Sequence, residues 1–167
     1  MEAKYMFDIT IKGRVARKKD LKEYVQRVMH HYFGNRLRRV IDLDIQMYTE
    51  IDEGSIAGYC YGDKDAVQIE LARNWSKSQR KNRVKRPFTY DELVLNLTHE
   101  LVHAKQFIRG EISTKHDKWK RSEYTYNCAR VAYHNQPWEI EAYKSEDMLK
   151  SLYWDKVWET AELEDDE

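Results

Sequence analysis

The sequence predicts a single α+β domain, in which a small, mostly antiparallel sheet packs on one central helix and a long helix follows near the C-terminus. Three observations predict this class. Several short segments alternate apolar and polar residues, as half-buried strands do, and others repeat apolar residues every three or four positions, as amphipathic helices do. The length of 167 residues suits one domain. We therefore assign residues 1–160 to this domain and residues 161–167 to an acidic tail.

The first half of the chain accounts for the expected sheet and its first helix. A helix is predicted where the apolar residues from Leu21 to Tyr32 fall at helical spacing, and Gly34 supplies its stop. Alternating apolar residues predict four strands, the last two of which are typical of a hairpin, at residues 7–11, 41–47, 55–61 and 66–72.

Two further helices are predicted from their termini. Thr89 and Glu92 form a T-x-x-E capping box, so we expect a helix from about residue 90 to residue 109, with Gly110 as its stop. Pro137 stands where the first position of a last, long helix is expected, and that helix continues to about residue 160.

Composition excludes several classes of protein. Lys plus Arg and Asp plus Glu both number 29, so the net charge is zero, which excludes a globally basic nucleic-acid-binding protein. Cys60 and Cys128 have no C-x-x-C partner, which excludes a disulfide framework and a cysteine-based zinc site. No apolar run approaches the roughly 18 residues of a membrane span, and the N-terminus lacks the pattern of a signal peptide. We expect a cytoplasmic protein with no membrane partner.

The chemistry is expected in the predicted helix after Thr89, which contains the motif H-E-x-x-H at residues 99–103. Residues four apart lie one turn apart on the same helix face, so His99 and His103 can both reach one Zn²⁺ at about 2.0–2.1 Å. Glu100 lies about 100° round the helix, beside the metal, where it can take a proton from a water molecule that the metal activates. The alternative is an ordinary helix with two surface histidines.

The helical wheel favours a metal site over two surface histidines. Apolar residues form one arc of this helix, and a polar stripe flanked by Leu95, Val102 and Phe107 lies on the opposite side. We expect this stripe to be sheltered, with amides and a carboxylate around the two imidazoles, as in a metal site with its supporting hydrogen bonds. The stripe consists of Glu92, Asn96, His99, His103 and Gln106.

A catalytic zinc site requires a third protein ligand, and Glu139 is our candidate. Glu139 and Glu141 are about 200° apart on the wheel of the last helix, so they cannot both face the metal. Glu139 falls at the edge of the buried arc, where a carboxylate is costly unless it is paired or metal-bound, whereas Glu141 falls on the polar arc. The alternatives are a buried ion pair at Glu139 and ligation by His116 instead.

The segment THELVHAKQFIRGE, Trp119-Lys120 and QPWEIEAY together resemble the small zincin-type metallopeptidases encoded by tailed bacteriophages. Their gluzincin pattern is an H-E-x-x-H motif followed by a Glu in an E-x-E-A helix. This resemblance covers roughly residues 88–150 and implies a zincin-like fold, zinc ligation by His99, His103 and Glu139, and Glu100 as general base. Many gluzincins carry an Asp four residues after the ligand Glu, whereas Tyr143 stands there in this chain.

A weaker resemblance connects H-E-x-x-H-A and a later His near Trp119-Lys120 to the SprT/Spartan-like proteases, which cut proteins crosslinked to DNA. It implies His116 as the third ligand. Residues 73–86 carry seven basic residues and no acid, so this segment would contact the DNA. The Gly expected after that His is Asp117 here. Without this role, the basic segment is a solvated loop.

The sequence therefore predicts a zinc-dependent metallopeptidase that acts on a protein or peptide substrate, located in the host cytoplasm if a phage encodes it. Two alternatives stay open: the DNA-associated protease and a non-catalytic binding module with a structural zinc. A tyrosine among Tyr124, Tyr126 and Tyr133 could stabilise an oxyanion, and the sequence does not choose among them.

Overall fold

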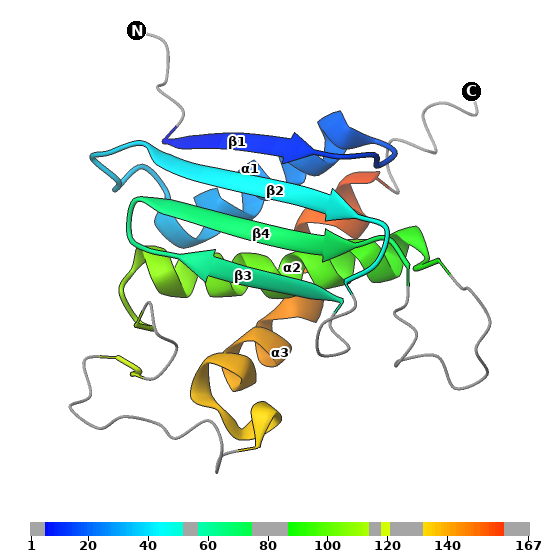
Figure 1. Cartoon of the computed structure of the whole chain (residues 1–167). Helices are drawn as coiled ribbons and strands as arrows, with labels where there is room; N and C mark the ends of the chain where they lie inside the picture. The colour runs from blue at the N-terminus through cyan, green and yellow to red at the C-terminus, as the bar shows by residue number, and fades with distance from the viewer. Residues whose placement is uncertain (1–5, 52–56, 75–86, 114–117, 121–131, 159–167) are drawn as a thin grey trace, which may run out of the picture.

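A computed structural model describes residues 6–51, 57–74, 87–113, 118–120 and 132–158 (Figure 1). Helices α1 and α2 lie on the same side of a four-stranded sheet, and α3 packs on α2 (Figure 1). The elements are β1 (Phe7–Lys12), α1 (Lys18–Phe33), β2 (Ile41–Tyr48), β3 (Gly58–Gly62), β4 (Ala66–Ala72), α2 (Tyr90–Ile108) and α3 (Pro137–Lys150). The predicted α+β class is confirmed.

The sheet is mixed, so the prediction of a mostly antiparallel sheet is wrong. In the strand order β1-β2-β4-β3, the pairs β1–β2 and β2–β4 are parallel and only β3–β4 is antiparallel. Alternating apolar residues show which face of a strand is buried, but they do not show its direction. The crossover through α1 returns the chain to the end of the sheet where β1 began, which makes β2 parallel to β1.

The core lies between the sheet and the two helices behind it. The strand register places Ile11, Ile45, Ile69 and Cys60 in one row across the sheet, with their side chains on the helix side. Tyr24 of α1 is fully buried against this core, as its helical spacing predicted. The hairpin of β3 and β4 is confirmed, and it places β3 at the edge of the sheet against α2.

The two helices that carry the candidate site begin as predicted. Thr89 caps α2: its hydroxyl accepts from the backbone N–H of Glu92, and the Glu92 carboxylate accepts from the backbone N–H of Thr89. Pro137 occupies the first turn of α3, which continues through a π-helical turn at Ser151–Asp155. None of the described helices combines the length and the apolar character needed to cross a membrane.

The capping box predicts a measurable loss of stability. Thr89→Ala removes the acceptor for the backbone N–H of Glu92, and we expect the free energy of unfolding to fall by about 1 kcal/mol. Thr89→Ser keeps a hydroxyl and should stay close to the wild type. Urea unfolding followed by circular dichroism measures both, and an Ala variant as stable as the Ser variant would show that this cap does not stabilise α2.

Candidate metal centre

The second half of α2 is buried on all sides, which is unusual for a helix of a small domain. Every residue from Leu97 to Ile108 is buried, because β3 and β4 cover one side of α2 and α3 covers another. The predicted polar stripe therefore lies between two layers of structure. His99, His103 and Gln106 are buried as expected, and polar groups at such positions need partners.

Glu139 of α3 supplies the partner for both imidazoles. Its Oε2 lies 2.9 Å from Nε2 of His99, and its Oε1 lies 3.0 Å from Nε2 of His103. The two Nε2 atoms are 3.2 Å apart. All three residues are buried, and they lie close enough together to bind one metal ion.

The spacing of these atoms fits a tetrahedral metal ion. Donors bound to zinc at about 2.0–2.1 Å in tetrahedral geometry are roughly 3.3 Å apart. The observed separations of 2.9, 3.0 and 3.2 Å are near that value. Two imidazole nitrogens and one carboxylate oxygen are also a ligand set that catalytic zinc sites use. The geometry is thus compatible with the predicted ligand set, and the identity of the metal stays a prediction.

Each imidazole is oriented by a second hydrogen bond on its far side. Nδ1 of His99 lies 2.7 Å from Oε2 of Glu146, and Nδ1 of His103 lies 2.8 Å from Oε1 of Gln106. Since an ionised carboxylate and an amide oxygen only accept, both Nδ1 atoms donate. Both Nε2 atoms then have their lone pairs available to a metal.

Sequence reasoning missed the role of Glu146. It lies seven residues, or about two turns, after Glu139, so both carboxylates project from one face of α3. That spacing is a signal that could have identified it. Tyr143, which stands where many gluzincins have an Asp, instead places its ring against His99, with 4.7 Å between the ring centroids.

The charges of the metal-free site balance one another. Burial opposes charge on the imidazole, but hydrogen bonds to Glu139 and Glu146 outweigh it and raise the pKa of His99 to about 10. Burial likewise raises the pKa of Glu139, but the two histidines outweigh it and lower that pKa to about 2. A cation in this position would take the place of the histidine protons opposite the same carboxylate.

Glu100 lies between the metal cluster and the edge strand. Its side chain is buried, and burial raises its pKa above the ordinary value, although the charges on His103 and His99 oppose this. A Cβ atom added to Gly58 of β3 would lie 3.1 Å from both Cγ and Oε1 of Glu100. The glycine therefore leaves the space in which the Glu100 carboxylate sits beside the cluster.

Tyr133 is the described tyrosine that reaches the ligand carboxylate. It belongs to a short 3-10 turn, Tyr133–Asn135, just before α3, and its hydroxyl hydrogen-bonds to Glu139. Its side chain is nevertheless half exposed, at 51%. Tyr133 thus lies where solvent and the cluster meet, while Tyr124 and Tyr126 lie outside the described residues.

The structure corrects the expectation for Glu141. Its side chain is only 26% exposed, and Oε1 lies 2.6 Å from Nζ of Lys105, a buried cation of α2 that the wheel did not identify as a partner. Glu141 is therefore not a free residue of the polar arc. His116 and residues 75–86 lie outside the described residues, so the predicted DNA contact stays a prediction.

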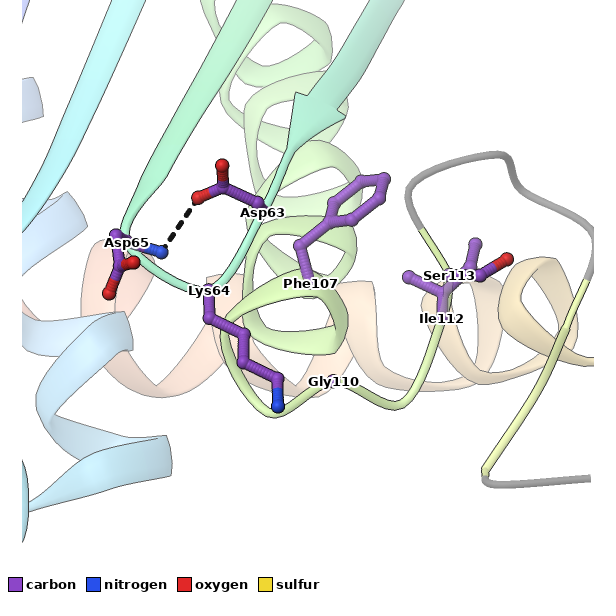
Figure 2. Close-up of a pocket in the computed structure, with 7 residues that line it drawn as sticks. All are labelled: Asp63, Lys64, Asp65, Phe107, Gly110, Ile112 and Ser113. Atoms are coloured by element: carbon purple, nitrogen blue, oxygen red, sulfur yellow. Dashed lines mark hydrogen bonds between the residues drawn. The ribbon is translucent and has the colours of Figure 1, made fainter.

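A separate pocket opens near the C-terminal end of α2, beside the turn between β3 and β4 (Figure 2). Its volume is about 430 Å³, but the Asp63 carboxylate in its wall accepts hydrogen bonds from the backbone N–H groups of Asp65 and Ala66. That carboxylate serves the turn itself. The lining shares no residue with the metal cluster and consists of Asp63, Lys64, Asp65, Phe107, Gly110, Ile112 and Ser113.

The metal cluster, unlike this pocket, combines ligands with a buried carboxylate of raised pKa. Such groups are typical of functional sites. Comparisons of the chain with protein-family models, with curated proteins and with solved structures find no match. The functional assignment therefore depends on the chemistry of these residues.

The ligand set predicts which carboxylate controls metal affinity. Glu139→Gln keeps the shape of the side chain but removes its charge, and we expect the affinity for Zn²⁺ to fall at least about 100-fold, more than an outer hydrogen-bond partner is worth. Asp147→Asn makes the same change at an exposed position of the same helix and should leave the affinity unchanged. Competition with a chromophoric chelator measures both. Equal affinities for the two variants would exclude Glu139 as a ligand.

Proposed function

We propose that this protein is a zinc-dependent peptidase with His99, His103 and Glu139 as zinc ligands and Glu100 as general base. The convergence of two imidazole nitrogens and one carboxylate oxygen, with a second buried carboxylate alongside, carries this proposal. The resemblance of the H-E-x-x-H segment to phage-encoded zincin-type metallopeptidases supports peptide bonds as the target.

The ligand count favours a catalytic site over a structural one. Structural zinc sites have four protein ligands, whereas catalytic sites have three and keep one position open. Within the described residues, three side chains form the cluster. A structural site would also leave Glu100, a buried carboxylate that packs against Gly58, without a role.

A bound zinc ion would supply Lewis acidity, polarising the scissile carbonyl and lowering the pKa of a water molecule. Glu100 would accept the proton of the attacking water and then deliver it to the leaving amine. Its raised pKa suits this exchange, because a general base works best when its pKa approaches the working pH. Glu146 and Gln106 would hold the two imidazoles in place during the reaction.

Tyr133 is the residue we assign to the oxyanion. Its hydroxyl already reaches the Glu139 carboxylate, and its exposed side chain leaves it room to turn toward a substrate. A hydrogen bond from this hydroxyl would stabilise the negative charge that develops on the carbonyl oxygen. The structure thus favours Tyr133 over the other tyrosines near the cluster, since the ring of Tyr143 packs on His99 instead.

Exchange of the general base separates chemistry from metal binding. Glu100→Gln removes the proton acceptor without removing a ligand, so we expect kcat for a casein-derived peptide mixture to fall about 10²–10⁴-fold with zinc content intact. Glu70→Gln, on the opposite face of the sheet, is the matched control. If Glu100→Gln hydrolyses peptides at the wild-type rate while it binds zinc, another residue is the base.

The oxyanion assignment predicts a different kinetic pattern for the tyrosine. Tyr133→Phe should lower kcat about 10²-fold, the value of one oxyanion donor, while KM and zinc affinity stay close to those of the wild type. Tyr143→Phe retains the ring that packs on His99 and should have a smaller effect. The opposite ranking in steady-state kinetics would assign the oxyanion to Tyr143.

A further inference from the structure

A buried lysine lies one turn away from the metal cluster. Lys105 of α2 is only 4% exposed, and its Nζ lies 2.6 Å from Oε1 of Glu141 and 2.7 Å from Oε1 of Glu111. The ring centroid of Tyr32 lies 5.3 Å from the same Nζ. This cation is therefore enclosed by two carboxylates and an aromatic face.

Stability alone is a weak reason to keep such a cluster. Transfer of charged groups out of water costs several kcal/mol per ion, and apolar residues of similar size often replace a buried ion pair without loss. Buried polar networks do, however, fix one arrangement of the groups they contact. The question is which group this network holds in place.

The group in contact with the network is the amide of Gln106. Its Nε2 donates to the backbone oxygen of Trp138 at 2.9 Å and to Oε1 of Glu141 at 3.2 Å. Both of these atoms are acceptors only, so the NH₂ end of the amide must face α3. Its oxygen must then face Nδ1 of His103, at 2.8 Å.

The orientation of the amide determines which nitrogen His103 presents to a metal. The amide oxygen can only accept, so Nδ1 of His103 carries the proton and Nε2 keeps its lone pair toward Glu139. A flipped amide would place an NH₂ group against Nδ1 and favour the other tautomer. Glu141 opposes that flip, because the flip would bring two oxygens together.

We propose that Glu141, anchored by Lys105, is a positioning residue of the metal centre: it holds the Gln106 amide in the orientation that makes Nε2 of His103 available to the metal. The inference rests on the metal-dependent function proposed above. It extends the centre beyond its ligands to an ion pair between α2 and α3. Glu141 touches neither the ligands nor the general base and acts through Gln106.

The two carboxylates on Lys105 provide a matched pair of variants. Glu141→Ala and Glu111→Ala each leave Lys105 with one carboxylate, but in the structure only Glu141 contacts the Gln106 side chain. We expect Glu141→Ala to weaken Zn²⁺ binding about tenfold, the lower end of the range for outer hydrogen-bond partners, and Glu111→Ala to bind as the wild type does. Chelator competition on variants shown to be folded by circular dichroism measures this.

A double-mutant cycle tests whether Glu141 acts through the amide. In a Gln106→Leu background no amide is left to orient, so Glu141→Ala should cause no further loss of Zn²⁺ affinity. Nuclear magnetic resonance of the zinc-loaded protein gives a second readout. The Nδ1–H signal of His103 should be protected from exchange in the wild type and in Glu111→Ala, but not in Glu141→Ala. Glu141→Gln keeps the side-chain volume, and if the Ala variant does not fold it should show a loss in the same direction.

The outcomes separate this inference from the proposed function. If the wild type binds zinc and Glu141→Ala binds it as tightly as Glu111→Ala does, the positioning role is excluded and the metal centre is unaffected. An additive loss in the Gln106→Leu background would also exclude it, because Glu141 would then act by another route. A wild type that binds no zinc would overturn the proposed function, and this inference with it.

Discussion

The contact of the Glu139 carboxylate with both imidazoles of α2 is the interaction on which the rest of the candidate site depends. It joins α3 to α2 at the point where α2 is buried on every side. Three ionisable groups in one interior position are stable only if they compensate each other or share a cation. The packing of α3, the direction of both imidazoles and the position of Tyr133 all follow from this contact.

The surrounding structure is arranged to keep this polar centre in one conformation. The sheet covers α2 with apolar side chains, while β3 approaches so closely that a glycine is needed opposite Glu100. On the other side, Glu146 and Gln106 hold the far nitrogens of the two histidines. Polar groups of this kind lower the apolar content of a core, and proteins tolerate such exceptions mainly at functional sites.

Local patterns in the sequence predicted much of this arrangement. The capping box at Thr89, the helix start at Pro137 and the buried side of Glu139 depend on neighbours within one helix, and the structure confirms each of them. The directions of the strands were not predictable from alternation, which encodes only the buried face. Glu146 and the partner of Glu141 were missed because each depends on how α3 lies against α2, which no single helical wheel contains.

Anomalous diffraction from crystals of the zinc-loaded protein tests the central claim most directly, because it locates the metal independently of activity. The account predicts one zinc peak within bonding distance, about 2.0–2.2 Å, of Nε2 of His99, Nε2 of His103 and a carboxylate oxygen of Glu139. A zinc peak elsewhere, or one that His116 completes while Glu139 stays unbound, would contradict it.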